Sequence, residues 1–302
     1  MDEAQKDPTA EKSALMRALR NSPRAQLFIA VAFCLLAALL RWWVAPELEL
    51  LPADYVSETS YAANLRSRET PSSPALETEN IVRRRDQTLN SSDSHCIIQG
   101  DAHWSTLAGS VIFETRNLYG VDRRNRQNLP GYGNESRTGQ YLFPPHTEKR
   151  QYGMWDPLYG GPYVAAFESV EQWRGLEVYV FKFLADGIDE TAGYASRPDV
   201  PEKYRVLTYG QGRFWVEPVS GVVVDHEDAG VSYLIEPKTS RREGEPINEW
   251  KQRYTHETVE AQLKDAKATR WRMHALEVWL PVAFLPAGLF AMTLSFLGRR
   301  KK

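Results

Sequence analysis

Two apolar segments near the ends of the chain are separated by a long, mostly polar middle part. They run from Leu27 to Ala45 and from Ala275 to Leu297, and a helix needs about 20 residues to cross a hydrocarbon core of about 30 Å. Both segments are therefore expected to span a membrane. Basic residues lie on the terminal side of each segment, at positions 17, 20, 24 and 299–302. The positive-inside rule then predicts cytoplasmic termini and an external middle part.

Aromatic and basic residues mark the expected membrane interface. Arg41, Trp42 and Trp43 lie near the outer end of the first span, and Trp279 lies near the outer end of the second. The alternative is that the first segment is a cleaved signal peptide. Its polar lead is long, and bulky residues stand where small ones should precede a cleavage site, so we favour an uncleaved anchor. We expect a two-span protein of the cytoplasmic membrane.

The middle part carries repeated strand signals. The stretch from Ala102 to Val121 predicts a strand that turns at Asp122–Asn125, and Leu176–Leu184 predicts a strand buried on both faces. Further strand signals occur at residues 163–170, 204–209, 213–216, 221–225 and 231–235. Turn-forming Gly, Pro and Asn separate these runs. The external domain is therefore predicted to be β-rich.

The two flanks of this domain have different compositions. Residues 46–75 are polar and predict a linker with at most one early strand, whereas residues 247–273 lack Gly and Pro and predict a helix that runs into the second span. The expected fold class is α+β, a β-rich external domain between two transmembrane helices, the second extended by a long juxtamembrane helix. The predicted parts are a tail (1–25), a span (26–45), the domain (46–245), the juxtamembrane helix (246–273), a span (274–297) and a basic tail (298–302).

Composition agrees with a folded domain. Hydrophobic residues make up 42% of the chain and charged residues 25%, as in ordinary globular proteins. The formal net charge of −2 gives no basic field, so nucleic acid is not an expected partner. The two cysteines are Cys34, inside the first span, and Cys96, in the external domain. The membrane boundary between them argues against an internal disulfide.

Candidate catalytic and metal-binding groups are few. His95, Cys96 and His103 are metal-ligand types, but their spacing matches no common zinc pattern and a fourth ligand is missing. The acidic run at 225–228 offers calcium ligands or acid–base groups, yet its sequence context predicts a solvated hairpin turn. No nucleophile elbow, phosphate-binding loop, dinucleotide fingerprint or zinc-protease motif is present. We therefore expect no enzyme activity, cofactor or resident metal.

Three segments go beyond composition: Gly139–Pro157, Trp173–Phe183 and Arg213–Asp228. Their distinctive residues are Phe143, Pro144, Thr147, Glu148, Lys149, Arg150, Tyr152, Trp155 and Asp156, then Gly175, Leu176, Tyr179 and Phe181, then Trp215, Val216, Pro218 and Gly221. Together they resemble the envelope proteins grouped as domain of unknown function 3068 and labelled the PorA family. Ser220 stands where the family more often has Thr, and Glu217 where Asp is usual.

The resemblance implies a β-rich external domain between two anchors, no recognised enzyme activity and, for some members, a link to lipoglycan assembly and phospholipid binding. The layout is also similar to that of class B scavenger receptors. A pore made of membrane-crossing strands is not expected, because the spans are hydrophobic helices. A channel formed by oligomerisation of the two spans is a further alternative.

Three functional hypotheses follow. In the first, the external domain binds or passes a membrane lipid or lipid-linked glycan, with Tyr152, Trp155, Tyr159 and Tyr163 on the rim of the site. Burial in the core is the alternative for these aromatic residues. In the second hypothesis, the domain docks on another envelope protein as an assembly subunit. The third is an enzyme acting on envelope glycans, with Glu148 and Asp156 as the carboxylates to test. The sequence does not give an oligomeric state.

Overall fold

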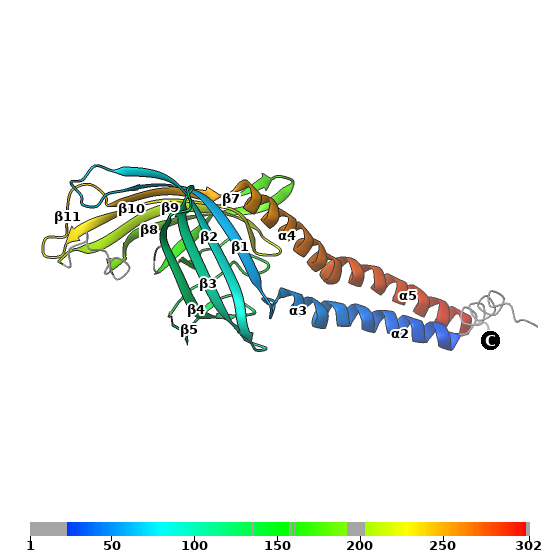
Figure 1. Ribbon diagram of the computed structural model, residues 1–302. Helices are drawn as coiled ribbons and strands as arrows, with labels where there is room; N and C mark the ends of the chain where they lie inside the picture. Colours follow the sequence, from blue (N-terminus) through cyan, green and yellow to red (C-terminus); the bar gives the residue numbers. More distant parts are fainter. Residues whose placement is uncertain (1–22, 135, 157–158, 160, 192–202, 300–302) are drawn as a thin grey trace, which may run out of the picture. The chain divides into compact units, whose positions relative to one another are not determined.

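The computed structural model describes residues 23–134, 136–156, 159, 161–191 and 203–299. The chain divides into two compact units. One comprises Glu49–Arg270 and contains the sheet, and the other comprises Met1–Leu48 together with Trp271–Lys302. We call them the sheet unit and the helical unit and describe each separately (Figure 1).

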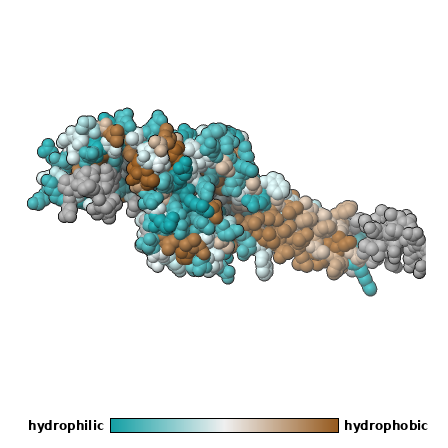
Figure 2. Space-filling model, in the orientation of Figure 1, coloured by the Kyte–Doolittle hydropathy of each residue, from teal (hydrophilic) through white to brown (hydrophobic). Residues whose placement is uncertain are grey.

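The helical unit contains two helices long and apolar enough to cross a membrane, Arg24–Glu49 and the end of His256–Thr293. Their parts are α2 (Pro23–Leu39), the π-helical η1 (Leu40–Val44), α3 (Ala45–Glu49), η3 (Ala275–Trp279) and α5 (Leu280–Arg299). The rings of Phe33 and Phe284 stack 5.7 Å apart, and Gly288 lies so close to α2 that an added Cβ would meet the Ala30 oxygen at 3.0 Å. A small residue at the contact thus allows close packing of apolar helices. Figure 2 shows the apolar surface of these helices.

The sheet unit is built on one antiparallel 12-stranded sheet. Along the sheet the strand order is β5-β4-β3-β2-β1-β12-β10-β9-β8-β7-β6, and β11 pairs with β10 outside this path. The strands are β1 (Val56–Ser67), β2 (Leu76–Ser91), β3 (His95–Thr106), β4 (Val111–Asp122), β5 (Asn128–Gly133), β6 (Tyr152–Asp156), β7 (Gly161–Trp173), β8 (Leu176–Asp189), β9 (Arg205–Glu217), β10 (Val222–Glu236), β11 (Arg241–Arg242) and β12 (Asn248–Tyr254). In Figure 1, β1 to β4 bend away from the layer formed by β8 to β10.

The two ends of the sheet meet at one residue. Gln140 forms an antiparallel bridge to Gln127, beside β5, and a parallel bridge to Met154 on β6. Its backbone N–H donates to the Gly153 oxygen at 2.6 Å, and its own oxygen accepts from the Trp155 N–H at 2.9 Å. The curved sheet therefore encloses an interior between its halves, and we call the face toward this interior the inner face.

The inner face carries an aromatic core. Phe143, Tyr159, Phe181 and Phe183 are fully buried there together with Tyr152, Tyr163 and Phe214. Phe143 lies 4.7 Å from Phe181, measured between ring centroids. Interlocked rings of this size supply much of the burial that stabilises a domain without a disulfide.

Helix α4 (His256–His274) packs on the outer face. Val259, Leu263 and Ala266 lie at helical spacing and contact a second core formed by Leu176, Val178, Val180, Trp215 and Val224. Thr255 caps the helix, because its Oγ1 accepts the Thr258 N–H at 3.2 Å. A cap and one apolar stripe thus explain where α4 begins and which face it buries.

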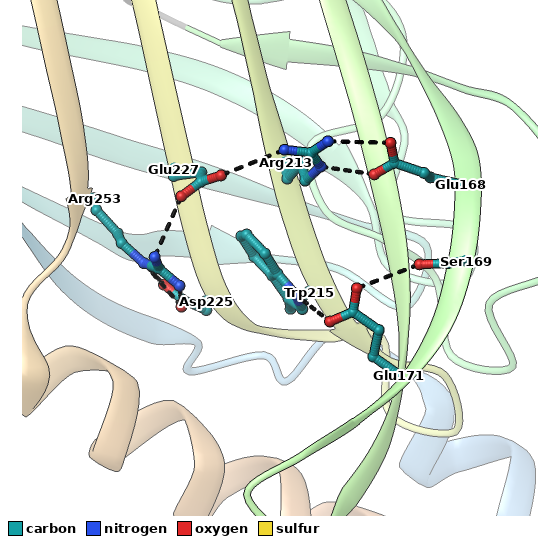
Figure 3. A network of polar contacts seen from close by, with 8 residues as sticks. All are labelled: Glu168, Ser169, Glu171, Arg213, Trp215, Asp225, Glu227 and Arg253. Atoms are coloured by element: carbon teal, nitrogen blue, oxygen red, sulfur yellow. Dashed lines mark hydrogen bonds and ion pairs between the residues drawn. The ribbon is translucent and has the colours of Figure 1, made fainter.

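A polar network lies on the outer face beside this core (Figure 3). Arg213 donates to both Glu168 oxygens, at 2.6 and 3.2 Å, and Arg253 binds the Asp225 carboxylate at 2.6 Å. Glu227 lies between the two arginines, 3.8 Å from Arg213 and 3.3 Å from Arg253. The indole N–H of Trp215 donates to Glu171 at 3.1 Å.

The α+β class with a β-rich domain is confirmed, but several predicted boundaries were wrong. The early strand allowed for at residues 46–75 is β1. The predicted 102–121 strand is the end of β3, a turn at residues 107–110 and β4. The strands expected at 204–209 and 213–216 are both parts of β9, and those at 221–225 and 231–235 are both parts of β10.

The juxtamembrane helix was also predicted to begin too early, since residues 248–254 form β12 and α4 starts at His256. Leu184 is exposed, so β8 is not buried along both faces. The turn at Asp122 is confirmed, because its Oδ1 accepts the N–H groups of Arg124 and Asn125.

Candidate functional site

A cavity of about 130 Å³, lined by charged, polar and aromatic residues, lies on the inner face of the sheet unit. Its walls come from β1 to β4, from the segment around Tyr141, and from β6, β7, β9, β10 and β12. The groups that define its chemistry are Arg84, Asp86, Arg137, Trp155, Asp156 and His226. The cavity therefore draws together residues that are far apart in the sequence.

Arg84 and Asp156 form an ion pair across the interior. Arg84 is on β2 and Asp156 on β6, far from each other along the strand order. Two hydrogen bonds join the guanidinium to the two carboxylate oxygens, at 3.0 and 3.2 Å. The guanidinium also lies 5.1 Å from the ring centroid of Tyr61. This two-pronged geometry fixes the orientation of both charges.

Asp86 is held by two tyrosine hydroxyls. Tyr119 donates to one of its oxygens at 2.9 Å and Tyr141 to the other at 2.7 Å. Burial raises the pKa of Asp86, against the opposing effect of these hydrogen bonds and of the nearby Arg137. Arg137 covers the ring of Tyr119 at 3.5 Å from the centroid. The cavity lining therefore contains two guanidinium groups, those of Arg84 and Arg137, and three acidic residues, Asp86, Asp101 and Asp156. The carboxylate of Asp101 is bound by Arg116 on the outer face, so the remaining formal charges balance.

A β-bulge determines which β10 residues face the interior. Val223 pairs with Val216 and Asp225 with Trp215, so Val224 is an extra residue in β10. After the bulge, His226 and Asp228 point inward, whereas Asp225 points outward to Arg253. The extra residue thus delivers an imidazole and a carboxyl group to the inner face.

His226 brings an unpaired nitrogen to the cavity wall. Its ring stacks on Phe214 with centroids 4.2 Å apart, and its Nδ1 lies 3.1 Å from the Tyr61 hydroxyl. Nε2 has no hydrogen-bond partner among the described residues, and neither has the indole nitrogen of Trp155. Burial lowers the pKa of His226 to about 3, so the imidazole is neutral near pH 7.

Asp228 lies deeper beside the aromatic core. It accepts from the indole N–H of Trp250 at 2.8 Å and from the amide of Gln252 at 2.9 Å. Burial raises the pKa of Asp228 to about 7, although both hydrogen bonds oppose the shift. The protonation of this buried carboxyl group therefore changes near neutral pH.

The structure places the predicted rim residues mostly in the core. Tyr152, Tyr159 and Tyr163 are buried, and only Trp155 is half-buried at the cavity. Tyr152 and Tyr159 are therefore core residues and not rim residues, whereas Tyr163, although buried, lines the cavity together with Trp155. Replacing Tyr159 by alanine would open a hole beside Trp250 and Phe183, so this substitution is expected to destabilise the domain.

The family-motif residues have structural positions. Phe143 belongs to the aromatic core, and Trp215 is buried beneath α4. Gly221 has a φ of 74° and lies against the carbonyls of Phe143 and Pro144, which leaves no room for a Cβ. The carbonyl of Pro218 accepts the Thr147 N–H at 2.7 Å. Gly175 turns the β7–β8 hairpin with a φ of 82°. Trp155 and Asp156 are the motif residues that reach the cavity.

Other predicted groups do not form a site. His95 contacts Ser92, Cys96 is a buried free cysteine, and His103 faces Glu114 at 3.5 Å. The predicted solvated turn at 225–228 was wrong, because these residues belong to β10. Of the two candidate carboxylates, Glu148 is exposed and only Asp156 lines the cavity. The aromatic interface residues Trp42, Trp43 and Trp279 are exposed, as is Arg41, and they lie in η1 and η3.

Sequence reasoning missed most of the cavity residues. Arg84 and Asp86 are two positions apart in a charged run, which is the spacing of one face of a strand. That alternation was the available signal. For Arg137 and His226 no pattern in the sequence indicated that they face the cavity. Arg137 is placed by a loop, and His226 is turned inward by a β-bulge.

Comparison with known proteins agrees with this architecture. A search of curated proteins finds no match for the chain. The family model described as Porin PorA matches residues 23–297, a range that contains both candidate spans and the whole sheet unit. The chain therefore belongs to the PorA family.

Proposed function

We propose that this PorA-family protein is a non-enzymatic protein of the cytoplasmic membrane whose external domain binds the sugar or polyol part of a lipid or lipid-linked glycan. Both termini lie in the cytoplasm under this proposal, and the sheet unit lies outside. The observation that carries it is the cavity of the inner face, with its balanced charges and unpaired donors.

The size of the cavity favours a ring over an acyl chain. A cavity of about 150 Å³ is known to hold one benzene molecule, so a volume of about 130 Å³ has room for a single six-membered ring. An apolar chain in the cavity would lie beside the unpaired nitrogens of His226 and Trp155, which costs free energy.

The charge balance favours a neutral, hydroxyl-rich ligand. Asp156 already neutralises Arg84, and Asp86 lies beside Arg137. Hydroxyl groups can both donate and accept, so they can satisfy the nitrogens of His226 and Trp155 without adding charge. Aromatic rings beside these groups offer faces for the carbon skeleton of a sugar.

The outer face of the sheet agrees with an external domain. Ion pairs such as Arg213–Glu168 and Arg116–Asp101 cover strands β3, β4, β7 and β9 on that face. A strand surface in contact with lipid would carry an apolar band there. The membrane anchors are therefore the two apolar helices, and the sheet is the ligand-binding part.

The test is native mass spectrometry of the full chain extracted in detergent. Thr59 lines the cavity and Glu58, its neighbour on β1, is exposed. We expect a co-extracted molecule with a sugar or polyol fragment on the wild type and on Glu58→Trp, and its loss from Thr59→Trp at unchanged folding. Equal retention by both variants, or a wild type without a bound molecule, would contradict the proposal. The second outcome would favour the assembly-subunit hypothesis.

A further inference from the structure

Strand β4 presents a free backbone edge. Its pairing with β5 covers only Tyr119 to Val121, and among the described residues no strand pairs with the outer edge of β4 before Tyr119. All residues from Val111 to Arg116 are exposed. A free edge of this kind is a template for another strand.

The direction of the free backbone groups is known from Leu118. Its N–H donates to Asn134 and its oxygen accepts from Asn134, so both groups point away from β3. The pairing of β3 with β4 is regular from Phe113 onward. Because backbone groups alternate along an antiparallel strand, Glu114 and Arg116 also direct their N–H and C=O groups to the free edge.

The side chains at this edge are self-complementary. Two copies of β4 that pair about a two-fold axis at Thr115 place Glu114 opposite Arg116 of the second copy, and Arg116 opposite its Glu114. A shift by two residues in either direction would instead place Glu114 opposite Glu114, or Arg116 opposite Arg116, and like charges directly opposite are destabilising. Only registers displaced by an even number of residues need to be compared. In an antiparallel pair about a two-fold axis, side chains directly opposite each other must point to the same face of the sheet.

Charged residues often protect an edge strand from association. An edge strand whose charges all have the same sign repels the same strand of a second copy. The edge of β4 carries both a negative and a positive side chain, so two copies of it attract each other. Glu114 contacts His103 and Arg116 binds Asp101, yet both side chains keep 74% of their surface exposed. Exposed Val111 and Ile112 continue the edge with apolar surface.

We propose that the sheet units of two copies of this chain pair through β4, antiparallel and in register about Thr115. The occupant of the edge is thus a second copy of the chain, and the two sheets continue into one another across the two-fold axis. This inference rests on the backbone and charges of β4, whose Thr115 and Asn117 also line the cavity.

The first test measures association of the full chain in detergent, by energy transfer between dyes attached after Lys302. We expect Glu114→Arg and Arg116→Glu each to weaken self-association about tenfold or more, because both symmetric pairs become like-charged. The double variant E114R/R116E should regain wild-type association, and an equimolar mixture of the two single variants should form mixed dimers. Association that is unchanged in both single variants, or absent in the wild type, would overturn the proposal.

The second test fixes the register by cysteine cross-linking under a mild oxidant, in a Cys34→Ala background. Buried Cys96 serves as the unreactive internal thiol. Residues directly opposite in a non-hydrogen-bonded pair have Cα atoms about 4.5 Å apart, within disulfide range, whereas neighbours displaced by two residues lie at about 7 to 8 Å. Thr115→Cys should therefore cross-link and its controls Glu114→Cys and Arg116→Cys should not. Preferential cross-linking of either control would contradict this register.

Discussion

The two faces of the sheet hold arginine–carboxylate pairs of similar geometry in very different surroundings. On the outer face, Arg213 and Glu168 share two hydrogen bonds and keep 41% and 35% of their side-chain surface exposed. On the inner face, Arg84 and Asp156 also share two hydrogen bonds, with 16% and 6% exposed. Water reaches both partners freely on the outer face and only through the cavity on the inner one.

Exposure therefore decides what each pair contributes. An exposed pair contributes little to stability, since solvent screens it and ordering two long side chains costs entropy. Removing one partner of a buried pair leaves a charge without solvent or counter-ion. The inner pair can define a binding site for the same reason, because its charges are fixed and only partly hydrated.

The largest expected effect is on the inner pair. Asp156→Leu leaves the guanidinium of Arg84 unpaired in the interior, and we expect the free energy of unfolding to fall by about 3 to 5 kcal/mol in chemical denaturation. The double variant R84M/D156L removes both charges and should recover most of this loss. Unchanged stability of Asp156→Leu would show that the interior is more hydrated than the structure indicates.

The next effect concerns the apolar core beneath the outer network. Trp215 is 7% exposed and packs against Trp173 and α4. Trp215→Ala should lower the free energy of unfolding by about 3 kcal/mol, through lost burial and a new cavity. Leu184→Ala is the control at an exposed apolar position on neighbouring β8. A Trp215→Ala protein with the wild-type melting temperature would show that outer-face stability does not depend on this core.

The pH dependence of stability should separate two inner-face groups by sign. The pKa of Asp228 is raised from 3.8 to about 7, so its contribution to stability is present below about pH 4 and is lost as the pH rises toward 7. The pKa of His226 is lowered from 6.5 to about 3, so its contribution is present above pH 6.5 and is lost as the pH falls.

Single variants should expose these opposing slopes. Relative to the wild type, Asp228→Asn should gain about 2 kcal/mol on going from pH 4.5 to 6.5, and His226→Gln should lose about as much. Denaturant unfolding at both pH values gives the comparison. Slopes of the same sign in the two variants would contradict the assignment of His226 as a buried neutral imidazole.

The smallest effect is expected in the outer network. Arg213→Gln should change the free energy of unfolding by less than about 1 kcal/mol, and the change should shrink further at high salt. The same denaturation measurement checks it. A loss equal to that of Asp156→Leu would remove the distinction between the faces.

The sequence predicted features that depend on local chemistry. The apolar helices, the β-rich class and the turn between the strand signals at 213–216 and 221–225 follow from composition, periodicity and the backbone freedom of glycine. The start of α4 was misplaced because residues 248–254 contain good helix formers. Their alternation, with Asn248 and Gln252 buried and Lys251 and Arg253 exposed, is the period of a strand.

The cavity could not be assembled from the sequence for a different reason. It depends on long-range pairing, since Arg84 meets Asp156 only because the sheet curves. His226 faces inward only because of the extra residue Val224. The aromatic residues at 152–163 were ambiguous because a core position and a binding-site rim favour the same side chains.

The imidazole of His226 offers the most direct measurement of the proposed ligand site. In the full chain with nitrogen-labelled histidine, the resonance of His226 Nε2, assigned by its absence from His226→Gln, reports whether this nitrogen has a hydrogen-bond partner. We predict that the chemical shift of His226 Nε2 changes when the co-extracted molecule is removed from the wild type. In Thr59→Trp, the chemical shift should equal that of the wild type without the molecule, both before and after the removal step. A wild-type resonance that is identical before and after removal would contradict the claim that the ligand occupies the cavity.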